Sequence, residues 1–196
     1  MIDRVILNYF VPFTNGKFVA SCLMTSPDVI GKATTLNDYT NWVNNEYSDI
    51  DFWWIDSDHN WFNTTNWIDY IKPEVFEDQY KFYTCHEDYT ALYVKRLLPS
   101  ARIISIVPDL ELCKSNYLKK NWIQQQPIFE DSRVYKEFQA FNCLNDLVIN
   151  QVDLFKESSF IKTIEYLSNG LNITVDMEEI LAYRNIYFAH PMNQIT

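Results

Sequence analysis

The chain has 196 residues, of which 47% are hydrophobic and 16% aromatic. This length favours one domain over residues 1–196, and the apolar content excludes a wholly disordered chain. The 16 Lys and Arg residues face 26 Asp and Glu residues, which gives a net charge of −10. Nucleic acid is therefore excluded as the main partner, because binding its phosphate backbone requires clustered cations.

The cysteines and the hydropathy pattern indicate a reducing, aqueous compartment. The four cysteines are far apart and form no CxxC pair, which argues against a zinc cage and a disulfide framework. No stretch approaches the roughly 18 apolar residues of a membrane span, and the first residues lack a signal peptide's apolar segment. We expect a soluble, cytoplasmic protein without metal or membrane contact. The sequence leaves the oligomeric state open, a homo-oligomer included.

The first expected unit is a strand, a polar turn and a helix. Residues 4–10 are apolar and β-rich, residues 11–16 form a turn cluster, and a helix is expected from Lys17. Backbone amides at such a helix start, with Lys17 beside them, form an anion site, and Gly16 lets the backbone approach a phosphate. An ordinary strand-to-helix turn gives the same pattern, since Val11 and Phe18 depart from the Walker motif.

The middle of the chain is rich in aromatic residues and harder to assign. The tryptophans between residues 42 and 67 fit an acceptor pocket, a packed core or a protein interface. The segment around Asp56, Asp58 and His59 fits a solvated loop better than a metal site, because a fourth ligand is missing. Residues 79–84 alternate as a strand does, and residues 89–98 have helical spacing.

The second half continues the alternation of strands and helices. Residues 101–107 are almost all apolar, as in a parallel strand covered on both faces. Asp109 is a suitable N-cap for the helix that follows it. The remaining expectations are a helix over 110–121, mostly helix over 134–154, a helix over 160–167 ending near 169–170, an extended stretch over 172–175 and a helix over 178–188. The pattern predicts an α/β fold, a three-layer sandwich around a mainly parallel sheet.

The segment from Gln79 to Lys120 resembles the sulfotransferases that use 3′-phosphoadenosine-5′-phosphosulfate (PAPS), in a divergent bacterial or phage-like form. These proteins carry a Thr-His pair at a strand end, a Pro-x-Ala-Lys-Ile-Ile approach to an apolar strand, and a Ser eight residues after an Arg turn. The matching features here are Thr84-Cys85-His86, Pro99 to Ile104, and Ser115. The resemblance implies a fold of the P-loop nucleotide hydrolase and sulfotransferase type.

The same resemblance implies transfer of a sulfuryl group from PAPS to a small-molecule or saccharide acceptor. His86 is the expected general base, since its reference pKa lies near 6.5. Lys17 and the loop amides would neutralise charge on the moving group. The residues expected to hold the 5′-phosphosulfate are Thr14, Asn15, Gly16, Lys17 and Phe18, and Ser115 is expected to hold the 3′-phosphate.

One departure from the family pattern leaves other functions open. Val107 stands where the family has the arginine that grips the 3′-phosphate, and an aliphatic side chain cannot replace that contact. The candidate substitute cations are Arg102, Lys114, Lys119 and Arg184. One alternative is therefore a binding or scaffold protein that keeps the fold without catalysis, in which His86 is structural. A nucleotide kinase ranks below it, because no hydroxyl follows Lys17 to hold Mg²⁺.

Overall fold

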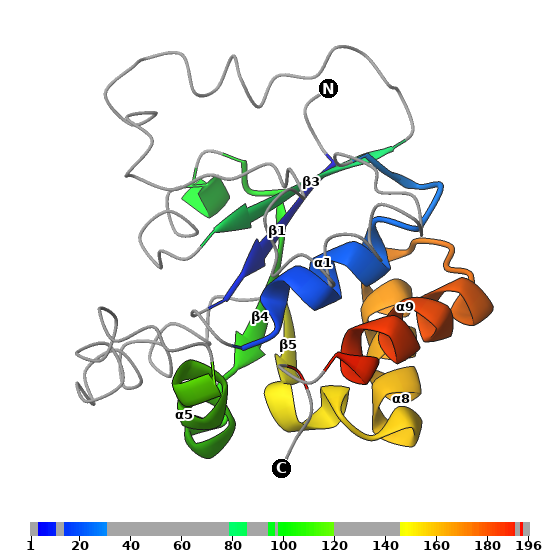
Figure 1. The fold of residues 1–196 in the computed structure, drawn as a ribbon. Coiled ribbons are helices and arrows are strands. Elements are labelled where there is room, and N and C mark those ends of the chain that lie inside the picture. Colours follow the sequence, from blue (N-terminus) through cyan, green and yellow to red (C-terminus); the bar gives the residue numbers. More distant parts are fainter. Residues whose placement is uncertain are drawn as a thin grey trace.

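A computed structural model describes residues 4–10, 14–30, 79–85, 94–96, 98–119, 146–190 and 193 of the chain. Within these residues a five-stranded sheet runs in the order β2-β3-β1-β4-β5, and all its strand pairs are parallel (Figure 1). The strands are β1 Val5–Tyr9, β2 Val29–Ile30, β3 Tyr80–Cys85, β4 Arg102–Val107 and β5 Leu147–Asn150. The predicted α/β class with a parallel central sheet is confirmed.

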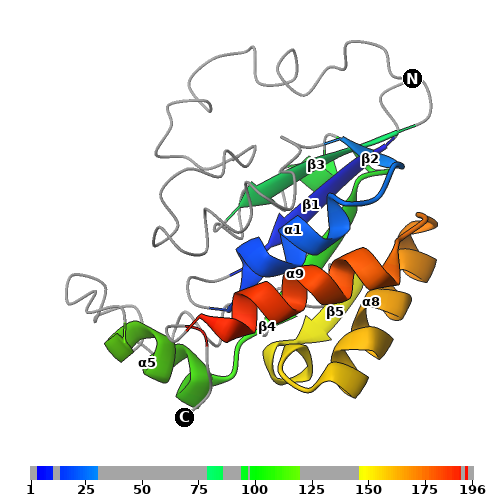
Figure 2. The ribbon, with the colours of Figure 1, turned by 45° about the vertical axis from the view of Figure 1, so that its right-hand side comes forward.

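Three helices gather on one face of this sheet. Figure 2 shows α9 lying between α1 and α8, with all three in front of the strands. A large cluster of buried side chains joins these helices to the sheet. The helical elements are α1 Gly16–Leu23, α5 Leu110–Lys119, the 3₁₀ turn η5 Gln151–Leu154, α8 Glu157–Leu171 and α9 Met177–Ala189. The helices expected after residues 16, 109, 159 and 177 are therefore present.

Strand β1 is central because its sequence suits burial on both faces. All five of its residues are buried. Side chains alternate along a strand, so Ile6 and Phe10 join the cluster under α1, whereas Leu7 and Tyr9 join a second cluster on the opposite face. The second cluster includes Val94, from the helical stretch 94–96. Both faces of the sheet therefore carry a packed apolar layer, as expected for a parallel sheet.

Strand β5 corrects the sequence prediction of helix over residues 134–154. Leu147 to Asn150 pair in parallel with β4, and residues 151–154 form the 3₁₀ turn η5. A short apolar run fits either period, and here Leu147 and Ile149 are buried in alternation with more exposed neighbours. Asp146 fixes the start of the strand, since its carboxylate accepts a 2.9 Å hydrogen bond from the Ile103 N–H. Residues 134–145 lie outside the described residues.

Helix α8 ends two residues later than its sequence predicts. The helix continues through Gly170, and Asn172 takes the left-handed conformation with a φ of 56°. The Ile173 N–H then donates to the Ser168 carbonyl at 3.0 Å, which satisfies an open helix carbonyl. Gly170 remains helical because it lies against β5, where an added Cβ would approach Leu147 Cδ2 to 2.4 Å. Asparagine tolerates the left-handed region better than most residues do.

Candidate functional site

The strand order places a topological switch point between the carboxyl ends of β1 and β4. The chain leaves β1 toward β2 at one edge of the sheet and leaves β4 toward β5 at the other edge. Neighbouring parallel strands with diverging connections form a switch point, and open α/β sheets bind ligands in the crevice there. In the described part of the chain, Asn15 before α1 and the turn at Pro108 and Asp109 before α5 follow the carboxyl ends of these two strands.

The start of α1 differs from the other helix starts in the described part of the chain. Its N-cap, Asn15, makes no side-chain cap hydrogen bond, and its first turn holds no acidic residue. Each of the other three described α-helices has an acidic side chain at its positive end: Asp109 and Glu111 at α5, Glu157 at α8, and Asp176, Glu178 and Glu179 at α9. No acidic side chain in the first turn of α1 therefore offsets the positive end of its dipole.

Lys17 adds a positive charge to this same helix start. It is the second residue of α1 and is only partly exposed. Burial lowers the pKa of its ammonium group, because the charged form loses solvation. A cation near a helix N-terminus is also unfavourable for the helix dipole. The first turn of α1 therefore concentrates positive charge at the switch point.

Gly16, which the sequence interpretation assigns to the close approach of a phosphate, also has a packing role. The ring of Phe10 covers its Cα so closely that an added Cβ would lie 2.0 Å from the ring's Cγ. The Gly16 carbonyl accepts a 3.0 Å hydrogen bond from the side-chain amide of Asn8, a fully buried residue of β1. The glycine is thus required by packing between β1 and α1, and this face of it is filled by protein.

The side chains of three other predicted cofactor residues point into the protein. Thr14 is fully buried, and Asn15 is 9% exposed. Phe18 is fully buried and stacks on the ring of Tyr187, with the two ring centroids 4.5 Å apart. Any contact of Phe18 with a ligand must therefore use its backbone N–H, because its ring belongs to the core.

Of the other two predicted site residues, the described part of the chain contains only Ser115. His86 follows the last residue of β3, Cys85, and lies outside the described residues. Ser115 is half-buried on α5, two positions after Cys113. Cys113 faces Gln151, with its sulfur 3.2 Å from the Gln151 side-chain oxygen. Two helical positions correspond to a rotation of about 200°, so Ser115 lies on the other side of α5.

Neither arginine among the candidate substitutes for Val107 is placed to grip a ligand in the crevice. Arg102 begins β4, at the amino edge of the sheet, where it binds the Gly170 carbonyl at 3.2 Å and lies 3.7 Å from Asp146. Arg184 donates to the Phe155 carbonyl and packs against two phenylalanine rings. Lys114 is exposed on α5, and the side chain of Lys119 is outside the described residues.

A buried hydrogen-bond network beside the crevice was not predicted from the sequence. Gln151 is fully buried, and its amide nitrogen donates to the Asn15 side-chain oxygen at 2.9 Å. Asn15 in turn donates to the Tyr187 hydroxyl at 3.0 Å. Gln151 lies 136 positions from Asn15 in the sequence, and a single glutamine after an apolar run carries no signal of such a contact.

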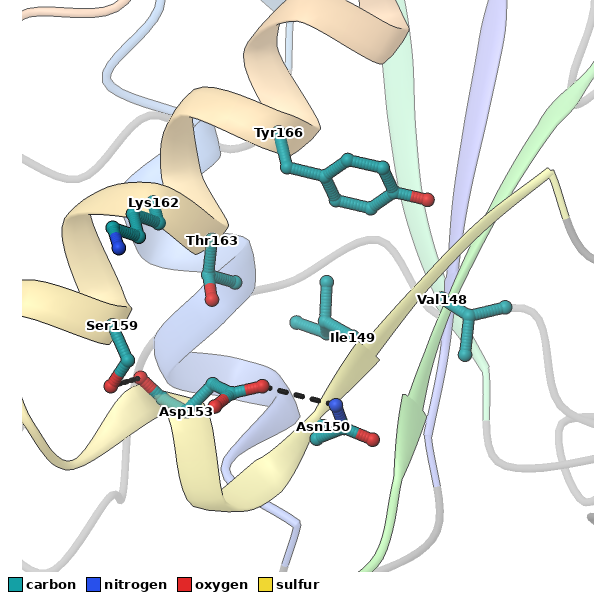
Figure 3. Close-up of a pocket in the computed structure, with 8 residues that line it drawn as sticks. All are labelled: Val148, Ile149, Asn150, Asp153, Ser159, Lys162, Thr163 and Tyr166. Atoms are coloured by element: carbon teal, nitrogen blue, oxygen red, sulfur yellow. Dashed lines mark hydrogen bonds between the residues drawn. The ribbon is translucent and has the colours of Figure 1, made fainter.

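A second hollow, of about 350 Å³, lies between α8 and the edge strand β5. Figure 3 shows the ring of Tyr166 extending across it, with Asn150 and Asp153 hydrogen-bonded at its other end. Its lining consists of Val148, Ile149, Asn150, Asp153, Ser159, Lys162, Thr163 and Tyr166. None of these residues was a sequence candidate, and the lining includes no residue of β1 or α1.

Two further findings concern metals and membranes, and both apply only to the described residues. No three His, Cys, Asp or Glu side chains in that part of the chain form a group that could hold a metal ion. None of its helices combines the length and the apolar character needed to cross a bilayer.

Comparison with known proteins adds no family name. No protein-family model matches the chain, and no curated protein matches its sequence. The class of protein therefore rests on the fold and the crevice: an α/β protein with a parallel five-stranded sheet and an electropositive helix start at its switch point.

Proposed function

We propose that this protein is a sulfotransferase of the P-loop type, which binds PAPS in the crevice between β1 and β4. The observation that carries the proposal is the start of α1, which combines Lys17 with an N-terminus that has no acid in its first turn. Helix N-termini of this kind bind phosphate and sulfate groups. The central position of β1 supports the P-loop assignment, because the loop after it opens at the switch point.

The proposed reaction moves a sulfuryl group in line from PAPS to an acceptor hydroxyl or amine. The bond between the sulfur and the bridging oxygen of the phosphosulfate breaks, a bond from the acceptor atom to the sulfur forms, and adenosine 3′,5′-bisphosphate leaves. Lys17 and the backbone N–H groups at the start of α1 stabilise the charge on the leaving phosphate. His86 takes the proton from the acceptor. A small molecule or a saccharide is the proposed acceptor.

The 3′-phosphate requires a separate contact in this proposal. The N-terminus of α5 does not offer one, because the Asp109 carboxylate already accepts the Leu112 N–H at 3.0 Å. Ser115 and Lys114 on the same helix supply a hydroxyl and a cation instead. This pair is weaker than the bidentate arginine for which Val107 stands, so we expect the 3′-phosphate to contribute less affinity here than such an arginine would provide.

Isothermal titration calorimetry with adenosine 3′,5′-bisphosphate tests the proposal. We expect saturable binding by the wild type and at least a tenfold weaker affinity in Lys17→Met. Lys162→Met is the matched control, because Lys162 is an exposed lysine on α8 that belongs to the other hollow. Absence of heat at millimolar ligand, or equal losses in the two variants, would overturn the proposal.

A binding or scaffold protein without catalysis is the second candidate. The burial of Phe10 against Gly16 favours it, because the ring fills the space beside the Gly16 Cα that a phosphosulfate would approach. Transfer assays with radiolabelled PAPS and a panel of phenols and sugars separate the two candidates. Turnover that is lost in His86→Ala supports the enzyme, and nucleotide binding without turnover supports the scaffold. In either case we propose a cytoplasmic location, where the buried thiols Cys22, Cys85 and Cys113 stay reduced.

A further inference from the structure

Gln151 makes hydrogen bonds to both sides of the crevice. Its side-chain nitrogen donates to Asn15 Oδ1 at 2.9 Å, and its side-chain oxygen accepts the Asp109 backbone N–H at 2.9 Å. The same oxygen lies 3.2 Å from the sulfur of Cys113. Asn15 follows β1, and Asp109 follows β4. One buried amide therefore joins the two loops that border the switch point.

The chain of contacts continues to the last helix. Asn15 donates through its Nδ2 to the Tyr187 hydroxyl at 3.0 Å, and Asn193 donates to the Tyr187 backbone carbonyl at 3.0 Å. Tyr187 is 4% exposed and Asn193 is 3% exposed. Asn15 is thus held from two sides, by Gln151 after β5 and by Tyr187 in α9, which leaves its side chain no role in capping α1.

The chemistry of an amide explains why a glutamine suits this position. Its side-chain nitrogen donates a hydrogen bond to Asn15 Oδ1, while its side-chain oxygen accepts one from the Asp109 backbone N–H. A carboxylate accepts only, and an apolar side chain does neither. Buried polar networks of this kind select one arrangement of the groups they join, since an unpaired member is costly. The Gln151 side chain consequently links the position of Asn15 to that of Asp109.

We propose that Gln151 is a positioning residue that couples the two sides of the crevice, so that an anion bound at the start of α1 also orders the turn after β4. The ligand side of this inference rests on the proposed function. The coupling itself needs no ligand, because both hydrogen bonds join groups of the protein alone. A bound 5′-phosphate would thereby hold α5, and with it Ser115, in the position where Ser115 contacts the 3′-phosphate.

Hydrogen exchange in the free protein tests the coupling first. In Gln151→Met, which keeps the side-chain volume but no amide, we expect amides in residues 14–20 and in residues 107–113 to exchange about tenfold faster. Leu154→Ala is the control, because Leu154 is a fully buried residue of the same 3₁₀ turn without a side-chain hydrogen bond. Faster exchange in only one of the two segments, or the same pattern in the control, would overturn the coupling.

The wild type provides a second test that does not depend on a variant folding. Cys113 is 1% exposed and touches Gln151, so its labelling by a thiol reagent reports opening of the turn after β4. We expect saturating adenosine 3′,5′-bisphosphate to slow the labelling of Cys113, measured by peptide mapping, about tenfold. Slowing in the wild type and its loss in Gln151→Met support the role of Gln151. Protection of residues 14–20 without any effect on Cys113 contradicts it.

The two tests also separate this inference from the proposed function. Absence of any ligand effect in the wild type counts against sulfotransferase binding, and the hydrogen exchange of the free protein then decides the coupling alone. If the ligand binds with normal affinity but residues 14–20 and residues 107–113 respond independently, the proposed function stands and Gln151 is only a structural residue.

Discussion

The ring of Phe10, the residue after the central strand β1, packs against Gly16, the first residue of helix α1. The ring of Phe10 occupies the position that a side chain at residue 16 would need, with 2.0 Å between an added Cβ and the ring's Cγ. A side chain at residue 16 would therefore displace the Phe10 ring from its place between β1 and α1.

Gly16→Ala should therefore lower the free energy of unfolding by about 1–3 kcal/mol, the usual range for overpacking a core. Gly170→Ala is the comparison, since its added Cβ meets the far end of the flexible Leu147 side chain and a helix interior gains up to about 1 kcal/mol when Ala replaces Gly. Urea unfolding of both variants measures the difference. Equal losses would show that the Phe10 ring can move aside, and Phe10→Leu should recover part of the loss in the Gly16→Ala background.

Asn15 combines a left-handed backbone with two side-chain hydrogen bonds, and its variants separate these contributions. Its φ is 64°, a conformation that costs an ordinary L-residue roughly 1–2 kcal/mol. Asn15→Gly loses only the side-chain contacts, whereas Asn15→Ala loses the contacts and strains the backbone as well. We expect Asn15→Ala to be less stable than Asn15→Gly by about 1 kcal/mol in thermal or urea unfolding. The reverse order would mean that the loop rearranges when the side chain is lost.

Gly16 and Asn15 illustrate how much of the molecule could be predicted from the sequence. The strand, turn and helix around them follow from an apolar run, a turn cluster and helical spacing, which are local properties of the sequence. The helix start as an anion site remains a prediction from the local pattern. The packing role of Gly16 could not be predicted, because a glycine needed for a phosphate and a glycine needed for a ring look alike in a sequence. The contact of Asn15 with Gln151 joins positions 136 apart, and only the packed fold reveals it.

Lys17 should reduce the stability of the free protein. Burial lowers the pKa of Lys17, and a cation at a helix N-terminus costs about 0.3–1 kcal/mol. Lys17→Met should therefore raise the Tm at pH 7 by roughly 1–4 °C, by the usual conversion for a chain of this size, although we expect the variant to lose ligand binding. Lys162→Met should change the Tm little, because that lysine is exposed.

The pH dependence of this effect has a definite sign. Between its lowered folded pKa and the ordinary value of 10.5, Lys17 binds more protons in the unfolded state than in the folded state. The free energy of unfolding of the wild type therefore rises with pH across this window. The advantage of Lys17→Met over the wild type should be largest at neutral pH and should shrink as the pH approaches 10.5. An advantage that is constant from pH 7 to pH 10.5 would show that burial of the charge is not its cause.

A variant at Ser115 tests whether α5 contacts the 3′-phosphate of the ligand. Its hydroxyl is half-buried on the side of the helix away from Cys113, and a single hydrogen bond contributes about 0.5–1.5 kcal/mol. Ser115→Ala should therefore weaken binding of adenosine 3′,5′-bisphosphate about 2- to 10-fold and leave adenosine 5′-monophosphate unaffected, as measured by calorimetry with the two nucleotides. Equal losses of affinity for the two nucleotides would mean that Ser115 only stabilises α5. No loss for either would mean that the 3′-phosphate lies elsewhere, with Lys114→Ala as the next variant to compare on the same pair of ligands.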